Sequence, residues 1–501
     1  MDCDRRGFSM LPVPQLRLEV RNERPVNPKG QFILYWMIAS RRSSWNFALD
    51  EAIEWAKNLK KPILVLEALR CDYQWASDRL HFFLLTGMAE NARRFQSSKV
   101  HYYPYVEMKK GEGKGLLSAL AAHSCLVITD HFPCFFLPRM VAAAASKIPV
   151  RLIQVDSNGL LPLRAAGQRF SSAYAFRRFL QKNLPPHLSS FPQAQPLAGL
   201  DLPSIDSLPA EIEKRWPPAS PQALANPSPI LSQFPIDHSI SPGIFSGGEA
   251  QAEELWKEFL YRKLDEYEKK RNQPQEEGTS GLSPYLHFGH ISVHRLFSDL
   301  SQKEKWSAER IASKSKGSRM GWWGMSPAAE AFLDQLVTWR ELGYNMCAWD
   351  ENYDRYESLP AWARSTLEKH SKDLRPYLYG PFQLEKAQTH DPLWNAAQIQ
   401  LIREGRIHNY LRMLWGKKIL EWSPSPQEAL ATMIELNNKY ALDGRDPNSY
   451  SGIFWVLGRY DRPWGPERPI FGKIRYMSSE NTARKVRIEN YKKKYSPPPT
   501  L

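Results

Sequence analysis

The sequence predicts a protein in two parts, an α/β domain with a doubly wound parallel sheet followed by an all-α domain. In residues 31–165, continuous apolar runs such as "FILYWM", "PILVLEAL" and "CLVITD" alternate with amphipathic stretches such as "WNFALDEAIEWAKNL". This alternation is typical of parallel strands covered by helices on both faces. From residue 247 onward, apolar residues recur at spacings of three and four, as in "HNYLRMLWGKKILEW". That spacing predicts helices.

The segments outside these two parts have different compositions. Residues 1–30 are expected to be an N-terminal extension, and residues 166–246 a Pro-rich interdomain linker. Thirteen prolines fall between positions 185 and 245, without a sustained apolar period. Such a segment is expected to cross the surface in an extended conformation. The helical domain is predicted over residues 247–495. No GxGxxG follows the first predicted strand, so the usual dinucleotide-binding loop is not supported there.

Length and composition limit the class of protein. A chain of 501 residues is too long for one hydrophobic core. With 42% hydrophobic residues and no apolar run of about 18 residues, it is predicted to be soluble and globular. The N-terminus lacks the apolar stretch of a secretory signal. Five scattered cysteines form no CxxC pair, which predicts an intracellular, reducing compartment.

The positive charge indicates a phosphate-bearing partner. The formal net charge is +14, and residues 459–495 hold eleven Lys or Arg against four Asp or Glu. Such an excess attracts nucleic acid independently of base sequence. The run "YKKKY" is equally consistent with a solvated tail. In "GRYDRPWGPERPIFGKIRYM", the interleaved aromatic residues and prolines favour a folded, ligand-facing surface.

The tryptophans of the helical domain allow two interpretations. Trp415 and Trp422 lie seven residues apart, about two helical turns, and Trp394 precedes them in "THDPLWN". Indoles at helical spacing are as a rule core residues. Indoles placed along a path can also pass an electron between a buried cofactor and the surface. Spacing alone leaves both interpretations open.

Five stretches in the C-terminal half resemble a known family. They are, in order, "GTSGLSPYLHFGHIS", "THDPLWNAAQ", "RMLWGKKILEW", "LNNKYALDGRDPNSYSGIFW" and "FGKIRYM". Together with the "YWM" strand they resemble the class II cyclobutane pyrimidine dimer photolyases of the photolyase/cryptochrome family, from Arg17 to Tyr495. The resemblance implies an α/β antenna domain and a helical FAD domain. It also implies light-driven repair of DNA, in which photoexcited reduced FAD donates an electron to a flipped-out dimer.

The resemblance implies a set of FAD-binding residues. Hydroxyls and backbone N–H groups of a Ser-rich turn suit the pyrophosphate. Asn437 lies where the family places an asparagine beside flavin N5, and a neutral amide there adds no buried negative charge to oppose reduction. The motif "LDGRDP" is also consistent with a helix-ending turn, and both roles can hold. The matched positions are Tyr267, Thr279, Ser280, Gly281, Leu282, Ser283, Arg412, Asn437, Asp443 and Asp446.

For the tryptophans, the resemblance implies an electron path. It places Trp415 nearest the flavin, Trp394 in the middle and Trp422 nearest solvent. Lys417 and Lys418 are expected to point away from this stripe, toward solvent or phosphate.

The resemblance also implies a set of DNA-contacting residues. A lesion within duplex DNA must leave the duplex to reach a buried flavin. The resemblance implies that Trp339 and Trp455 pack against the flipped dimer and that Met413 forms the floor. Each basic residue alone is more often a solvated surface residue than a ligand. The basic positions matched to the DNA contacts are Arg271, Arg462, Lys473 and Arg475.

Gln335 departs from the family pattern, which has a glutamate after "FL(D/E)". The family's carboxyl group hydrogen-bonds the dimer, for which it must be protonated and have a raised pKa. The glutamine amide is nearly isosteric and always donates, but it cannot pass on a proton. Reduced repair activity is therefore expected. Two alternatives remain, a cryptochrome-like blue-light photoreceptor and a non-catalytic DNA-binding protein with a vestigial flavin site.

The sequence says less about an antenna chromophore or a metal ion. An antenna chromophore, deazaflavin or folate, is compatible with the N-terminal domain, but "YWMIASRRSSWN" departs from the family's polar run, which leaves loss of the antenna open. His287 and His290 lack neighbouring Cys or His ligands, so a structural role is expected and no metal. A monomer acting on DNA in the cytoplasm or nucleoid is expected.

Overall fold

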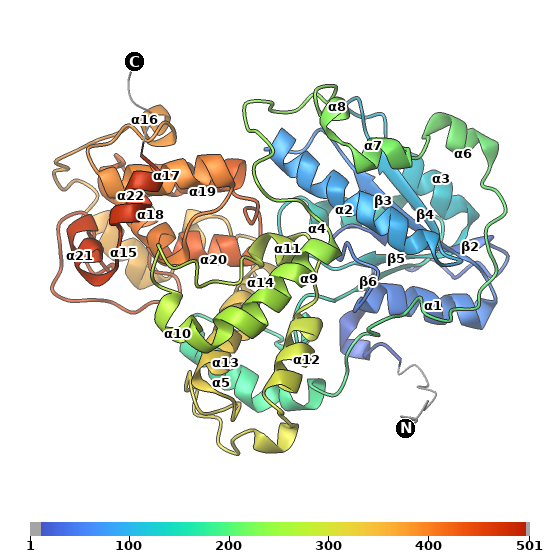
Figure 1. The fold of residues 1–501 in the computed structure, drawn as a ribbon, viewed down its shortest axis with the longest axis horizontal. Coiled ribbons are helices and arrows are strands. Elements are labelled where there is room, and N and C mark those ends of the chain that lie inside the picture. Colours follow the sequence, from blue (N-terminus) through green and yellow to red (C-terminus); the bar gives the residue numbers. More distant parts are fainter. Residues whose placement is uncertain (1–11, 497–501) are drawn as a thin grey trace.

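The computed structural model describes residues 12–496. Figure 1 shows a sheet with its covering helices beside a second part built of helices. Within residues 12–496, no helix is long and apolar enough to cross a membrane. The predicted fold class, an α/β part followed by a helical part, is confirmed.

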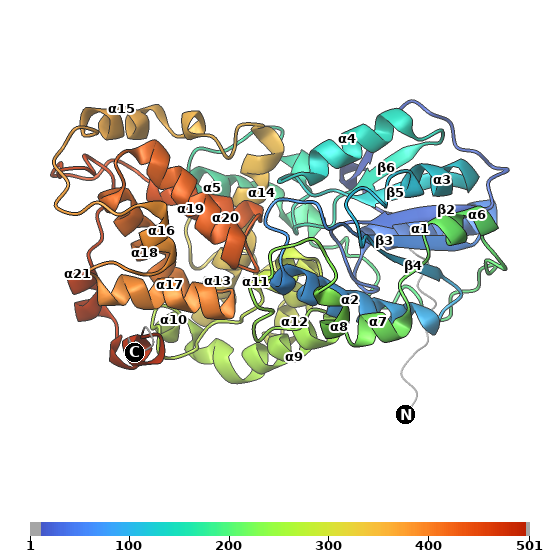
Figure 2. The same ribbon diagram turned by 90° about the horizontal axis from the view of Figure 1, so that it is seen from above.

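The sheet has the order β1-β6-β5-β2-β3-β4, and its neighbours are parallel except for the pair β1 and β6. Ile33 and Tyr35 of β2 bury against α1, whereas Leu34 and Trp36 face the opposite core. Figure 2 shows α3 and α4 above the sheet and α2 below it. The strands are β1 (Leu18–Val20), β2 (Phe32–Met37), β3 (Ile63–Leu69), β4 (His101–Val106), β5 (Ser124–Asp130) and β6 (Leu152–Val155). The helices are α1 (Phe47–Leu59), α2 (Asp78–Gln96), α3 (Leu116–His123) and α4 (Leu137–Lys147).

Two of the predicted segments contain secondary structure that was not expected. The predicted extension over residues 1–30 is in part a sheet element, because β1 pairs with β6; residues 1–11 lie outside the described residues. The predicted linker over residues 166–246 is interrupted by helices. It contains α5 (Ala173–Asn183), α6 (Ala210–Arg215), α7 (Pro221–Ala225) and α8 (Ser228–Leu231).

The short helices of the linker segment form because proline is compatible with the first turn of a helix. Both α7 and α8 carry a proline there. Leu224 and Leu231 then bury against Leu85 and Met88 of α2. Apolar contacts, which proline content does not reveal, therefore decide the conformation of this segment.

The helical part begins at residue 249. Its helices α13 and α14 are joined without interruption by a π-helical turn, η7 (Asp334–Trp339). The elements are α9 (Glu249–Glu258), α10 (Tyr267–Lys270), α11 (Ser283–His287), α12 (Val293–Lys303), α13 (Pro327–Leu333), α14 (Arg340–Trp349), α15 (Ala361–Lys369), α16 (Pro381–Glu385), α17 (Pro392–Glu404), α18 (Asn409–Trp422), α19 (Pro426–Tyr440), α20 (Pro447–Val456), α21 (Ser479–Lys485) and α22 (Glu489–Lys494).

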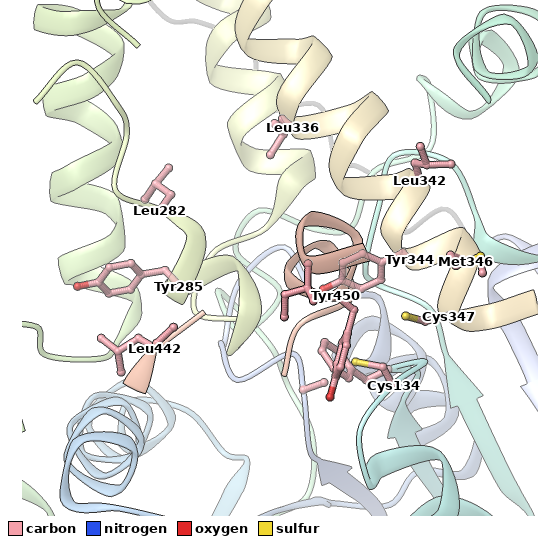
Figure 3. Close-up of a cluster of buried hydrophobic side chains, with 14 of the residues drawn as sticks. Cys134, Leu282, Tyr285, Leu336, Leu342, Tyr344, Met346, Cys347, Leu442 and Tyr450 are labelled. Carbon is pink, nitrogen blue, oxygen red and sulfur yellow. The ribbon is translucent and has the colours of Figure 1, made fainter. Parts of the chain in front are cut away.

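One hydrophobic core runs through both parts. Cys134, from the loop after β5, lies close to Tyr344 and Cys347 of α14 and Tyr450 of α20 (Figure 3). The rings of Phe132 and Tyr344 meet edge to face with centroids 5.8 Å apart. The two parts therefore share buried apolar surface at their interface.

Buried polar groups also join the two parts. Arg79 of α2 donates to the carbonyls of Ile402, at 2.6 Å, and Tyr440, at 2.9 Å, near the C-terminal ends of α17 and α19. Glu341 of α14 accepts from the backbone N–H of Leu160 at 2.7 Å and of Leu161 at 3.2 Å. These side chains pair with backbone carbonyls at two helix ends and with backbone N–H groups after β6, all of which would otherwise lack a hydrogen-bond partner.

The position of two lysines on α18 differs from the expectation. Lys417 is 0% exposed; its Nζ donates to the Val456 carbonyl at 2.5 Å and lies 5.0 Å from the centroid of the Trp455 ring. Lys418 is also buried and pairs with Glu421 at 2.8 Å. The prediction that both point toward solvent or phosphate is wrong, because α17, α19 and α20 pack around α18.

We expect Arg79→Met to lower the free energy of unfolding by at least about 2 kcal/mol, because it leaves buried carbonyls at two helix ends without a donor. Arg93→Met, an exposed position on the same helix, is the control and should change stability little. Urea denaturation measures both. Equal stability of the two variants would contradict the structural role of Arg79.

Lys417 should make stability depend on pH. Burial lowers its pKa from the ordinary 10.5 to about 7, although Asp461 acts in the opposite direction. Between those values the unfolded chain binds more protons than the folded chain, so the free energy of unfolding should rise with pH through this range. Lys417→Met should flatten that rise, and the exposed Lys29→Met should not. Denaturation measured from about pH 6 to 9 tests this, and identical pH profiles for Lys417→Met and the unaltered chain would refute it.

Candidate functional site

A cavity of about 1880 Å³ opens in the helical part. Its walls come from the start of α5, the segment 267–284, η7, the start of α18, α20 and the segment 460–477. Small-molecule sites usually measure about 300–1,000 Å³. This cavity therefore has room for a cofactor together with part of a second ligand.

One wall carries the turn predicted to hold a pyrophosphate. Tyr267 and every residue from Thr279 to Ser283 line the cavity. Gly281 has φ +68°, and a Cβ built there would meet no atom within 4 Å, so this backbone borders open space. Hydroxyls and accessible backbone at such a turn suit an anionic ligand.

A charged pair lies on the same wall. Arg412 Nη2 donates to Asp443 Oδ1 at 2.9 Å, and Arg412 Nη1 donates to Asn437 Oδ1 at 3.3 Å. Burial by itself raises the pKa of Asp443, but the Arg412 guanidinium and a hydrogen bond from Ser283 outweigh it and hold that pKa below its ordinary value. The carboxylate is therefore ionised at neutral pH.

Asn437 lies behind this pair and does not itself line the cavity. Its Nδ2 donates to Ser449 Oγ at 2.8 Å, and Ser449 does reach the cavity. The arrangement fixes a neutral amide behind the wall of the cavity, held by Arg412 on one side and Ser449 on the other.

The motif "LDGRDP" ends one helix, begins the next and also reaches the cavity. Asp446 lines the cavity and also accepts from Asn448 N as the N-cap of α20. Its Oδ2 accepts from the Tyr344 hydroxyl at 3.2 Å and lies 3.3 Å from His287 Nδ1. Arg445, at φ +62°, donates to the carbonyls at the end of α19. The motif is thus a helix-ending turn that also faces the cavity.

The π-helical turn η7 brings Gln335 and Trp339 into the cavity. A π turn adds a residue to the helical repeat, and such turns are frequent at functional sites. The neighbouring Asp334 is tied to Arg177 of α5 at 2.8 Å. The Gln335 amide makes no hydrogen bond within residues 12–496, so it is available to a ligand.

A second wall is aromatic and basic. Trp455 and Met413 line the cavity, and Arg475 lies 5.5 Å from the Trp455 ring centroid. The Trp464 ring centroid lies close to two guanidinium groups, that of Arg462 at 4.6 Å and that of Arg475 at 4.1 Å. Flat aromatic groups beside cations suit a stacked base with its phosphate.

Of the predicted DNA-contacting residues, Arg271 lies in the cavity wall and Lys473 lies outside it. One aromatic residue of the wall, Trp464, was not predicted. Arg271 lines the cavity, 5.8 Å from the Tyr267 ring. Lys473 does not line it and instead pairs with Glu467 at 3.6 Å. Trp464 was not singled out, although it stands in the aromatic and basic stretch "DRPWGPERP" that indicated a ligand-facing surface.

The three tryptophans of the predicted path are all buried. Trp415 Nε1 donates to Gln398 Oε1 at 2.8 Å, and Trp394 Nε1 donates to the Trp415 carbonyl at 3.0 Å. The Trp394 and Trp422 rings meet with centroids 5.6 Å apart. The indoles therefore form a contiguous buried group that starts one turn after Arg412 and Met413 on α18.

Trp422 was expected to lie nearest solvent, yet its ring is buried. It packs against Tyr379 at 5.5 Å and against His390 at 5.2 Å. Tyr377, which is half exposed, stacks on His390 at 3.7 Å. Other aromatic rings therefore separate Trp422 from water.

A second cavity, of about 490 Å³, lies where the parallel strands end and meet the helical part. Aromatic side chains line it, together with cations from both parts of the chain. The aromatic residues include Trp36, Tyr105, Phe132, Phe135, Phe136 and Phe288, and the cations are Arg41, Arg70, Lys114 and Arg445.

The two histidines of "HFGH" have structural contacts. His290 Nδ1 accepts from Gly248 N at 3.0 Å, and burial lowers the pKa of His290 to about 3. His287 faces Asp446. Among residues 12–496, no group of three or more His, Cys, Asp or Glu side chains is placed to hold a metal ion.

Three relatives align with this sequence over nearly its whole length. The chain is 34% identical to the deoxyribodipyrimidine photo-lyase of Methanothermobacter thermautotrophicus over 92% of this chain and 94% of that one. It is 31% identical to that of Arabidopsis thaliana, over 92% of this chain and 88% of that one. It is also 31% identical to that of Potorous tridactylus, over 94% of this chain and 82% of that one. No family model matches the chain.

A solved structure supports the fold. The bacterial class III photolyase of Agrobacterium tumefaciens superposes with a TM-score of 0.64 at 16% identity, covering 93% of this chain and 86% of that one. Such low identity bears on the fold alone. The sequence relatives carry the family assignment: the chain belongs to the photolyase/cryptochrome family.

Proposed function

We propose that this protein is a class II photolyase that repairs cyclobutane pyrimidine dimers in DNA by light-driven electron transfer from reduced FAD to a flipped-out dimer. The observation that carries the proposal is one continuous cavity with two chemically different walls. One wall has the hydroxyl-rich turn and the Arg412–Asp443 pair, and the other has Trp339, Trp455 and Gln335. A cofactor and a substrate could share such a cavity.

The residues fit FAD. Tyr267 and the turn from Thr279 to Ser283 would hold the pyrophosphate, while Arg412 and Asp443 would border the flavin's polar edge. Asn437 would keep a neutral amide near flavin N5, where a carboxylate would oppose reduction. When bound, FAD supplies the absorption of blue light and the electron that splits the dimer.

The substrate wall would receive the dimer. Trp339 and Trp455 would stack on the flipped bases, and stacking offsets part of the cost of taking them out of the duplex. Arg271, Arg462 and Arg475 would contact phosphates, with Met413 at the floor. Lys473, outside the cavity, would contact the backbone only by exchanging its pairing with Glu467.

The buried indoles would supply the electron path to the cavity. Trp415 would be the proximal member, and its place one turn after Arg412 on α18 supports that order. Trp394 would relay to Trp422 across ring contact. Burial shields all three side chains from water, which limits side reactions of an oxidised indole.

The second cavity would hold an antenna chromophore. Its aromatic lining suits a planar ring, and its cations suit an anionic group of a deazaflavin or a folate. We assign the antenna domain to residues 31–165 together with β1, and the FAD- and DNA-binding domain to residues 247–495 together with α5. We further propose a monomer acting on DNA inside the cell.

One observation favours a second function. Gln335 cannot deliver a proton, so a cryptochrome-like photoreceptor with weak or no repair is the alternative. Light-dependent restoration of thymines in an oligonucleotide with one defined dimer tests the proposal, with a dark sample as control. Photoreduction of bound FAD without any repair would favour the photoreceptor.

We expect Trp415→Phe to bind FAD yet slow photoreduction by an external thiol on the order of tenfold or more, since phenylalanine is far harder to oxidise than indole. The loss of oxidised-flavin absorbance under blue light measures this. Trp349→Phe, which replaces a half-exposed indole outside the group, is the matched control. An unchanged rate in Trp415→Phe would remove this residue from the path.

We expect Gln335→Leu to slow repair about 3- to 10-fold, the value of one lost neutral hydrogen bond. Gln335→Glu should repair faster than the native protein at low pH and lose that gain as the introduced carboxyl group ionises, because only its protonated form donates. The native protein should show a flatter pH profile. Equal repair in all three forms would mean that Gln335 does not contact the dimer.

A further inference from the structure

A surface beside the cavity carries exposed basic and aromatic residues that are not among the predicted DNA contacts. It is formed by α5 and by the segment 304–326 that joins α12 to α13. Figure 1 shows α5, in teal, among the helices of the second part and next to this yellow segment. In sequence, α5 belongs to the region predicted as a linker, about 130 residues before the segment it contacts.

The joining segment is firmly anchored. The side-chain amide of Gln181, 5% exposed, accepts from Gly317 N at 2.7 Å and donates to the Ser318 carbonyl at 2.8 Å. Trp306 Nε1 donates to the Trp323 carbonyl at 2.6 Å, and the Trp323 ring is buried. The exposed side chains of the segment therefore project from a fixed backbone.

These exposed side chains are strongly basic. Neither residues 173–183 nor residues 310–320 contain an Asp or Glu. The exposed cations of these two stretches, which make no ion pair within the described part of the chain, are Arg178, Lys182, Arg310, Lys314, Lys316 and Arg319. By contrast, the buried Arg177 is neutralised by Asp334. A charge run is usually only a solvated face, so a second feature is needed to indicate a ligand.

An exposed aromatic ring supplies that feature. Tyr174 is 57% exposed, although its ring rests on the backbone of Gly317. A Cβ at Gly317, where φ is +71°, would lie 2.8 Å from Tyr174 Cε2, so a side chain there would displace the ring. Met320, also exposed, stands on the same segment. The ring is thus in contact with a fixed backbone and more than half exposed, which leaves it available for stacking on a base.

The surface is continuous with the cavity. Tyr174 and Arg319 line the same cavity as Gln335 and Trp339. The Arg177–Asp334 pair joins α5 directly to η7. At the start of α5, Ser172 forms a β-bridge with Tyr460, two residues before Arg462. A strand that leaves the cavity on this side would pass over α5.

We propose that α5 and residues 312–320 of the joining segment form a second DNA-contacting surface. This surface binds backbone phosphates of the duplex beside the flipped dimer, and Tyr174 stacks on an unpaired base. The inference rests on the proposed function, because it needs a dimer in the cavity to place the duplex here. Lys314, Lys316 and Arg319 supply the phosphate contacts, and their fixed backbone lowers the ordering cost of binding.

The charge component is tested with a duplex that carries one central dimer, whose Kd is measured at several salt concentrations. The triple variant Lys314→Gln, Lys316→Gln, Arg319→Gln should reduce the slope of log K against log salt by about 2 to 3, since each phosphate contact contributes ~0.9. The control triple Lys29→Gln, Lys109→Gln, Lys147→Gln removes the same net charge from exposed positions of the α/β part. It should leave the slope near the native value.

The stacking component is tested with Tyr174→Ala and Tyr174→Phe. Alanine should weaken binding of the dimer-containing duplex about 5- to 100-fold, the range for loss of one base–aromatic stack, and phenylalanine should retain native affinity. A dimer in a single-stranded oligonucleotide of a few nucleotides can enter the cavity but lacks the flanking duplex that this surface is proposed to bind. Its repair should be the same in every variant, which also shows that the variants fold.

The outcomes separate the two proposals. If the native protein repairs both substrates while the basic triple variant keeps the native slope and Tyr174→Ala keeps the native affinity, the second surface is refuted and the photolyase assignment stands. If the native protein neither binds nor repairs either substrate, both proposals are refuted. If the variants are impaired equally on the duplex and on the short oligonucleotide, the residues act inside the cavity and the second surface is refuted.

Discussion

The arrangement of the two parts depends on buried polar groups at their interface, which have no water to replace a lost partner. Arg79 from α2 reaches the C-terminal ends of α17 and α19, and Glu341 from α14 caps the backbone after β6. Removing either partner would leave a buried charge or backbone group unpaired, which costs more than an average contact. The two parts therefore have one preferred docking geometry, and the apolar core continues through it.

This interface is coupled to the cavity through a single continuous helix. Glu341 lies at the start of α14, directly after the π-helical turn that presents Gln335 and Trp339. Asp334, on the same turn, is held by Arg177 of α5. The side chains of η7 are thus positioned from both ends, by the contact with the α/β part and by the contact with α5. A site that must hold a ligand at a defined distance benefits from such rigid support.

Helix α18 contributes to several features at once because it is buried on most sides. Arg412 contributes to the polar wall and Met413 to the floor, and Trp415 belongs to the buried indoles. Lys417 lies beneath the Trp455 ring, where a cation favours the aromatic face but is itself costly to bury. Whether a polar residue on such a helix is buried therefore depends on the helices packed around it, and helical periodicity does not reveal those contacts.

The two-part architecture could be predicted from the amino-acid sequence, because strands buried on both faces and helices with an apolar stripe leave periodic signals within a few residues. The sequence also indicated residues on both walls of the cavity through its resemblance to a family, and Trp464 stood in a stretch already marked as ligand-facing. The sequence could not predict that the Pro-rich region contains helices, that Lys417 is buried, or that α5 contacts Gly317 and Ser318. Each of these depends on contacts between residues far apart in the chain, and such contacts leave no local pattern.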